Sequence, residues 1–380
     1  MTSKILRRAL LGLSLNAALG FAQADEPVMD LSIFLTSRVG AINLLKEGKF
    51  HTAIRGEQTA LKIAEDQNGR TSLSLIPILT DEAVLHWHLA EYQTAEQELK
   101  WALALREKNL GSEDPKVADS LDPLAALYTD LNRLLEAEIL EKRALTLRQA
   151  ASTGNSEALA QSLALLARIE GQMKKPDEER KLYQRAFDIL KPLPHPNPTL
   201  MMDLLKDLAI SFSAAKEYSR AATCLEANLV FTGKNFPKDS VEVGNASLDL
   251  ADFSRGQGEI KRARPLYEAV RDINQRFVGN DDQYATLPYI ARLARANQGL
   301  GDFKSAAALW QRSLTAEMKI FGPTHPRVAL ALYHLAESES AMKKKAEAAK
   351  QLQQSLAILK KHFSSDHPLI LKINSKILKL

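Results

Sequence analysis

The sequence predicts an all-α solenoid of about eight helix-turn-helix repeats that ends in a C-terminal capping helix. Three observations predict this fold. A small residue recurs at steps of 42 or 43 positions, apolar residues between these positions follow one helical face, and breaker residues separate the helices. Hydrophobic residues make up 45% of the chain but aromatic residues only 6%. Such a core, rich in Ala and Leu, suits closely packed helices better than a sheet.

The repeat is anchored on a small residue that lies five positions after the break between two helices. The anchor positions are Ala53, Ala95, Ala137, Glu179, Ala221, Ala263, Ala306 and Ala348. Only Glu179 departs from the small-residue rule. A second set lies twelve positions earlier and consists of Ala41, Ala83, Ala125, Ala167, Ala209, Ala251, Ala294 and Ala336. Small residues on both sides of a turn let two antiparallel helices approach closely, because bulky side chains would force them apart.

Each unit divides into a first helix, a break and a second helix. The breaks fall at Gly48, Asn132, Lys174, Lys216, Gly258, Gly301 and Lys343. Gly and Asn tolerate the left-handed conformation that commonly ends a helix. Segments rich in Gly and Pro separate one unit from the next, as in residues 322–326 (GPTHP). Asp or Thr ahead of these points can cap the next helix, and the His-Pro pairs at His195, His325 and His367 are explained by helix entry.

This pattern resembles that of tetratricopeptide repeat (TPR) proteins, in particular the 42-residue variety found in kinesin light chains. The resemblance rests on the Leu-Ala pair of the first helix and on Gly-x-Phe/Tyr-x-x-Ala at the hairpin. The second-helix motif at residues 309–314 (LWQRSL) and Gly-x-x-His-Pro between units complete it. It covers about residues 31–380. The resemblance implies a right-handed superhelix that is not an enzyme and binds a protein or peptide on its concave surface.

The same resemblance implies where a partner would bind, because first helices mainly form that surface in the family. The variable positions lie three before, one after, and four or five after the repeated Ala. The candidate partner-binding residues among them are Trp87, Asp122, Arg168, Lys206, Asp252, Arg255, Arg295 and Tyr333. Kinesin light chains often carry Asn three positions before this Ala, where it can hold a peptide backbone. No unit of this chain has Asn there, so the mode of peptide binding departs from the family.

Four segments follow residue 24 in the expected organisation of the chain. We expect repeats one to four at residues 25–190, a Pro-rich loop at 191–198, repeats five to eight at 199–365 and the capping helix at 366–380. Prolines at four alternate positions of the loop exclude a helix and favour an extended conformation. The loop is interpreted either as a long connection or as a semi-rigid joint between two halves of one array.

Residues 1–24 have the features of a secretory signal peptide. Lys4, Arg7 and Arg8 precede an apolar run that ends in an Ala-x-Ala sequence. We expect cleavage after Ala24 and a periplasmic or secreted protein with no transmembrane segment. The general secretory and twin-arginine routes both stay open. The alternative interpretation is an ordinary first helix of the array.

No motif predicts a catalytic residue, a metal site or a cofactor. The sequence has no Gly-rich phosphate loop, zinc pattern or nucleophile elbow. His86 and His88 are two positions apart, which points them to different faces of a helix. Cys224, the single cysteine, cannot form an internal disulfide and is predicted to be a small buried hydrophobe. An enzyme that uses carboxylates of the groove is the least favoured hypothesis.

Charge gives no case for nucleic acid. The formal net charge is +4, but three basic and no acidic residues lie in the expected leader, so the mature chain would be nearly neutral. The last 38 residues carry nine lysines against Glu347 and Asp366. These lysines indicate a solvated capping face. The alternative function is binding of an anionic polymer or a membrane surface through this Lys-rich C-terminal repeat.

Overall fold

The computed structural model describes residues 44, 47–151, 157–279 and 283–380. The expected signal peptide at 1–24 and the first helix of the first repeat lie outside the described residues. Within the described ranges the secondary structure is helical without strands, which confirms the all-α repeat fold. The chain divides into two compact units, one up to Thr199 and one from Leu200 onward. Each unit is described by itself.

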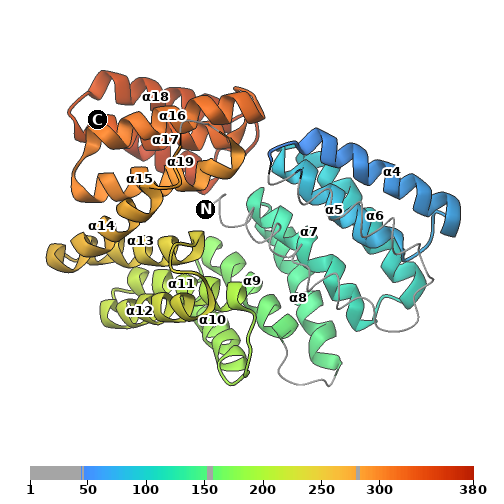
Figure 1. Ribbon diagram of the computed structural model, residues 1–380. Coiled ribbons are helices and arrows are strands. Elements are labelled where there is room, and N and C mark those ends of the chain that lie inside the picture. The colour runs from blue at the N-terminus through green and yellow to red at the C-terminus, as the bar shows by residue number, and fades with distance from the viewer. Residues whose placement is uncertain (1–43, 45–46, 152–156, 280–282) are drawn as a thin grey trace. The chain divides into compact units, whose positions relative to one another are not determined.

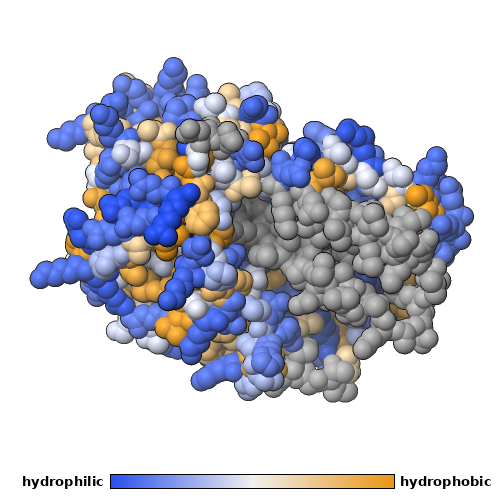
Figure 2. Space-filling view, in the orientation of Figure 1, coloured by the Kyte–Doolittle hydropathy of each residue, from blue (hydrophilic) through white to orange (hydrophobic). Residues whose placement is uncertain are grey.

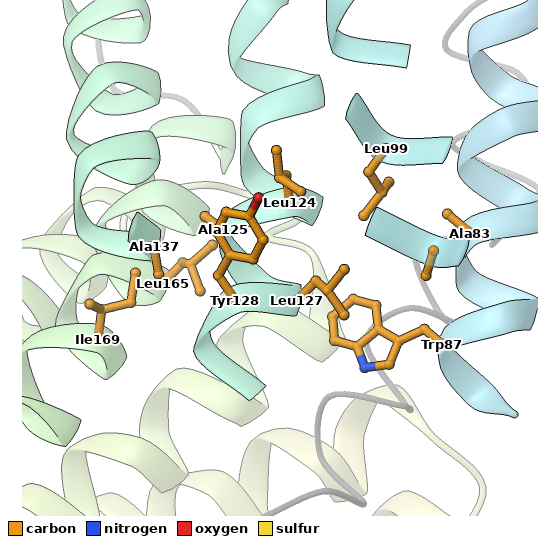
Figure 3. Close-up of a cluster of buried hydrophobic side chains, with 11 residues drawn as sticks. Ala83, Trp87, Leu99, Leu124, Ala125, Leu127, Tyr128, Ala137, Leu165 and Ile169 are labelled. Atoms are coloured by element: carbon orange, nitrogen blue, oxygen red, sulfur yellow. The ribbon is translucent and has the colours of Figure 1, made fainter. Parts of the chain in front are cut away.

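The first unit alternates second and first helices that pack on their neighbours in sequence (Figure 1). Its second helices are α4 (Phe50–Asn68), α6 (Tyr92–Leu110), α8 (Leu134–Ala150) and α10 (Pro176–Leu190). Its first helices are α5 (Leu75–His88), α7 (Ala118–Asp130), which follows the 3-10 turn η1 (Pro115–Val117), and α9 (Glu157–Gln172). Figure 3 shows one core of this unit, in which Trp87, Leu99 and Leu127 pack together.

The second unit continues the same alternation. Its first helices are α11 (Pro198–Ala214), α13 (Val241–Gly256), α15 (Leu287–Leu300), α17 (Pro326–Ala341) and the terminal α19 (Pro368–Ile377). Its second helices are α12 (Tyr218–Asn235), α14 (Ile260–Gln275), α16 (Phe303–Phe321) and α18 (Lys345–Leu359). The boundary between the units follows directly on the Pro-rich stretch, whose residues 191–197 are not helical.

One backbone feature repeats at every described break. The break residues have φ between 61° and 86°, and they are Gly48, Ala90, Asn132, Lys174, Lys216, Gly258, Gly301 and Lys343. The amide of the following residue donates to the carbonyl five positions back in the first helix, as in Arg133 to Tyr128 at 2.8 Å and Lys344 to Glu339 at 3.0 Å. This left-handed C-terminal motif confirms the predicted breaks. Ala90 carries no sequence signal for it, so tertiary packing imposes the conformation there.

The small anchor residues lie where a first and a second helix touch. Ala53, Ala95, Ala137, Ala221, Ala263, Ala306 and Ala348 are each at most 1% exposed. Glu179, the single large anchor, has a specific compensation. A Cβ on Gly171, in the first helix of the same repeat, would lie 2.6 Å from the Glu179 side chain. The missing side chain on α9 therefore makes room for the larger one on α10.

Two histidines cap α17 and α19, which both begin with proline. Nδ1 of His325 accepts the amide of Arg327 at 3.2 Å, and Nδ1 of His367 accepts the amide of Leu369 at 3.3 Å. Because proline at the first helical position donates no amide, the cap must reach the next residue. The histidine, rather than the preceding Thr or Asp, is thus the cap in these two connections.

Cys224 is half-buried beside Leu225 and its neighbours rather than fully buried. Burial raises the pKa of its thiol. The predicted apolar environment is present, but burial is incomplete.

Substitution of Gly171 by Ala is expected to lower the free energy of unfolding by about 1–3 kcal/mol, because the new methyl group overlaps the Glu179 side chain. Adding Glu179→Ala should recover most of this loss. Gly56→Ala is the matched control, since a Cβ on Gly56 in α4 meets nothing within 4 Å and should stabilise the helix. Denaturant titration of Gly171→Ala, Glu179→Ala, their double variant and Gly56→Ala checks the coupling, and additive effects would contradict the contact.

Substitution of Lys343 by Gly is expected to raise the free energy of unfolding by up to about 1 kcal/mol, because it removes the steric cost of a left-handed residue. Lys350→Gly, in the interior of α18, should lower it by about 1 kcal/mol. Thermal denaturation compares the two changes, and equal signs would be inconsistent with the left-handed break.

Candidate functional site

Four of the eight predicted residues come together on first helices of the second unit. Lys206 on α11 pairs with Asp249 on α13. Arg295 on α15 contacts the same Asp249 at 3.6 Å and binds Asp252 at 2.5 Å. The other oxygen of Asp252 accepts the hydroxyl of Tyr267 at 2.5 Å. We call this connected set of five residues the α11–α15 network.

The fourth predicted residue, Arg255, lies one turn after Asp252 on α13. Its guanidinium carbon is 6.0 Å from the centre of the Tyr267 ring, and its side chain is exposed. A Cβ on Gly299 of α15 would lie only 2.3 Å from the same ring, so glycine is needed where Tyr267 inserts. Burial and the Asp252 carboxylate raise the pKa of Tyr267 above its usual value. Tyr267 therefore stays a phenol and donates to Asp252.

A second polar cluster joins α17 to the terminal helix α19. Tyr333 is 1% exposed, and its hydroxyl donates to Glu337 at 2.8 Å. Lys376 of α19 forms an ion pair with the same Glu337 oxygen. The ammonium groups of Lys372 and Lys376 lie 4.9 and 5.0 Å from the centre of the Tyr333 ring. The predicted Tyr333 thus anchors α19 with its ring and hydroxyl.

The electrostatics of this cluster depend mainly on Lys376. Burial acts to raise the pKa of Glu337, but hydrogen bonds and charges from His334 and Lys376 lower it to about 2. Burial lowers the pKa of His334, which stacks on Trp310 with ring centres 4.6 Å apart. A neutral His334 contributes no charge near pH 7. The Lys376 ammonium therefore keeps Glu337 ionised there.

The three predicted residues of the first unit have different environments. Trp87 is 8% exposed in the core of Figure 3. Asp122 is also 8% exposed and binds Arg148 at 2.8 Å. Arg168 is half-buried, and its charge lowers the pKa of Asp130, although burial raises that pKa to about 7 overall. Trp87 and Asp122 thus have packing roles, and Arg255 is the most accessible of the eight candidates.

Sequence reasoning missed several members of the second-unit clusters. Asp249 and His334 lie two residues before the repeated Ala, a position that was not carried over from the family. Tyr267 belongs to a second helix, but its hydroxyl reaches the first-helix surface. Lys372 and Lys376 were attributed to the capping face. Their spacing of four residues, which places two side chains on one face of a helix, was the available signal.

The C-terminal lysines do not form a single patch. Lys343, Lys344 and Lys345 lie at the start of α18, whereas Lys360 and Lys361 lie at its end. Fifteen helical residues, or about 22 Å, separate the two groups. Figure 2 shows hydrophilic side chains along the edge where Figure 1 places α18. Seven of the nine lysines are thus divided among both ends of α18 and the Tyr333 cluster.

The described residues offer no group of three His, Cys, Asp or Glu side chains arranged to hold a metal ion. Among those same residues, no helix is both long and apolar enough to cross a membrane.

Comparison with known proteins agrees with this architecture. The tetratricopeptide repeat family model matches residues 116–191 and 285–361, with one match in each unit. Both matched segments are tetratricopeptide repeats. This confirms the resemblance seen in the sequence, and the TPR hairpin accounts for the left-handed breaks and the small anchors. No curated protein matches the sequence.

Several solved structures are similar to this chain. The apo quorum sensor NprR from B. thuringiensis is 13% identical, with a TM-score of 0.58 over 94% of this chain and 98% of that one. A putative kinesin light chain from Podosopora anserina with TPR-like repeats is 20% identical, with a TM-score of 0.45 over 54% of this chain and 96% of that one. BtubC (BKLC) from P. vanneervenii is 16% identical, with a TM-score of 0.42 over 61% and 91%. The similarity to NprR concerns the fold alone, and its coverage takes in both compact units.

Acidification is expected to release α19 from α17 as the pH falls from about 4 toward 2. The folded pKa of Glu337 is lowered, so its contribution to stability is present above the pKa of the unfolded chain and is lost as the carboxylate takes up a proton. Amide hydrogen exchange of residues 368–377 measures this release. Glu337→Gln should show the same weak protection at pH 7. Glu347→Gln, on the exposed start of α18, is the control, and equal protection in all three proteins would refute the anchor.

Proposed function

We propose that this TPR protein is a non-catalytic scaffold that binds a segment of a partner protein on the first helices of its second unit. The TPR fold, whose variable first-helix positions differ from its repeated packing positions, supports a protein-interaction role. The surface includes Arg255, Arg295 and Lys372. Its partner is a protein or peptide, and export through the N-terminal signal is part of the proposal.

The observation that carries the proposal is the pre-positioned polar surface of the second unit. Asp252 is fixed by both Tyr267 and Arg295, so its orientation is set before a partner arrives. Arg255 and Lys372 lie over tyrosine rings and have no carboxylate within ion-pair distance among the described side chains. Groups held in place lose less conformational freedom when they bind, and two such cations remain available for a partner.

Enzymatic activity is not part of the proposal. In the second unit, the carboxylates of Asp252 and Glu337 are engaged by cations and tyrosine hydroxyls. A general acid or base needs a proton that it can exchange with a substrate, and these groups are committed to internal partners. Their arrangement supports orientation and recognition.

The double variant Arg255→Glu/Lys372→Glu tests the binding surface. We expect its recovery of cross-linked partner to fall at least about tenfold, since loss of two favourable charge contacts and gain of repulsion costs more than about 1.4 kcal/mol. The control is Arg264→Glu/Lys261→Glu, which reverses two exposed charges on the second helix α14. Partner recovery that is equal for both double variants, with unchanged circular dichroism, would exclude this surface as the binding site.

A further inference from the structure

Three acidic residues of the first unit occupy positions that the repeat fills with apolar side chains elsewhere. Glu57 and Glu141 lie four residues after the anchor of the second helix. The other repeats, in both units, have Leu99, Tyr183, Leu225, Tyr267, Trp310 and Leu352 there. Glu82 lies just before the repeated Ala. The following repeats have a leucine at this position, namely Leu124, Leu166, Leu208, Leu250, Leu293 and Leu335. Glu57, Glu82 and Glu141 are 0%, 3% and 0% exposed.

Glu141 on α8 shares the interior of the first unit with Asp122 on α7. Neither carboxylate oxygen of Glu141 makes a hydrogen bond of normal geometry to the described residues. Arg148, further along α8, binds Asp122 at 2.8 Å and also reaches Asp119 at 3.0 Å. The hydroxyl of Ser162 on α9 is engaged by the same guanidinium. Arg148 is thus shared among other acceptors and forms no ion pair with Glu141.

The remaining charges near Glu141 do not change this balance. Burial and the charge of Asp122 raise its pKa well above the usual range, against smaller opposing effects of Ser162, Arg148 and Arg168. Lys116, in the 3-10 turn that packs on α8, is exposed to solvent. An isolated charge at a buried position costs far more than a neutral acid, so the proton stays on Glu141 when the helices are packed.

A second buried group surrounds His86 at the junction of α5 and α6. Nδ1 of His86 lies 2.5 Å from Glu91, and Nε2 lies 3.3 Å from Glu98. One oxygen of Glu98 and one of Glu82 are buried without a hydrogen bond to the described residues. Burial raises the pKa of Glu82 to about 7, and burial with the charges of Glu82 and Glu91 raises that of Glu98 to about 8.

Among the described residues, no lysine or arginine forms an ion pair with Glu82, Glu91 or Glu98. On the α4 side the interior contains Glu57, another acid. On α7, the hydroxyl of Tyr128 donates a hydrogen bond to Glu96, which also binds Lys100 and Arg133. The single imidazole of His86 can balance only one of the neighbouring carboxylates. His86 is engaged most closely by Glu91, so Glu82 and Glu98 must hold protons for the interior to remain neutral.

We propose that the first unit is a proton-dependent module, in which close packing of α5–α9 requires protons on Glu141 and on the Glu82–Glu98 pair. The folded-state pKa values of these acids lie above those of the unfolded chain. Their contribution to stability is therefore complete at low pH and is lost as the pH rises through the folded values, which are about 7 and 8 for Glu82 and Glu98. The first unit loosens over this range.

The second unit has no acidic residue at the equivalent positions of its repeats. In its four repeats, the residue four positions after the anchor and the residue just before the repeated Ala are all apolar or aromatic. The buried carboxyl of Glu317 on α16 has Arg327 at 3.5 Å. Helices α13 and α14 contain no buried carboxylate, so they provide an internal reference for the effect of pH.

Hydrogen exchange of the full chain, corrected for the intrinsic pH dependence of exchange, tests the proposal. Between about pH 6 and pH 9 we expect the protection of α5–α9 to fall at least about tenfold, since each deprotonation contributes up to tenfold per pH unit above the folded pKa. Protection of α13 and α14 should change less than about twofold. Constant protection of α5–α9 across this range would overturn the proposal.

The variant Glu82→Leu/Glu141→Leu introduces the leucine that other repeats have at these positions. Its helices α5–α9 should keep most of their protection from hydrogen exchange at pH 9. The variant Glu98→Gln/Glu141→Gln, which retains side-chain size, should also flatten the pH dependence if the leucine variant fails to fold. Glu136→Gln is the control because it neutralises an exposed acid on α8. The same loss of protection in the glutamine variant as in the natural chain would assign the pH effect to other groups and refute the proposal.

Discussion

The close approach of the two helices in each hairpin is the constraint on which the rest of the structure depends. The backbones come near enough that the contact position accepts Ala, and a left-handed residue must turn the chain between them. The exception follows the same rule, because the Glu179 side chain occupies space that Gly171 leaves empty. Ala90 and three lysines adopt left-handed conformations that they do not favour intrinsically. Packing of the hairpin therefore outweighs local preference at the turn.

The two units place different chemistry on this common backbone. In the second unit, the core positions after the anchors hold Leu, Tyr or Trp, and the hydroxyl of Tyr267 extends from the core to a polar surface. In two of the four repeats of the first unit, Glu57 and Glu141 occupy the same core position. A tyrosine satisfies its hydroxyl at the surface and buries its ring, whereas a buried carboxylate must find a cation or keep its proton. One repeat thus supports a surface network in one unit and proton-linked packing in the other.

The polar network of the second unit also shows how a repeat fold acquires a specific surface. Successive first helices bring Lys206, Asp249 and Arg295 into contact although they are about 40 residues apart in sequence. The repeated Ala and Leu positions cannot vary without loss of packing. The neighbouring positions can vary, and their charges decide what the surface recognises.

The sequence by itself determined the helical repeat, its length, and most of its breaks, since steric rules for small and left-handed positions act locally and recur. It also placed Lys206, Asp252, Arg255 and Arg295 on first helices. Only the tertiary structure decided that Lys206, Asp252 and Arg295 share one network, whereas Trp87 and Asp122 are buried. It also decided that Tyr267 joins this network from a second helix and that Lys376 of α19 joins the Tyr333 cluster. Burial and pairing depend on which side chains of neighbouring repeats meet, and the spacing within one repeat does not contain that information.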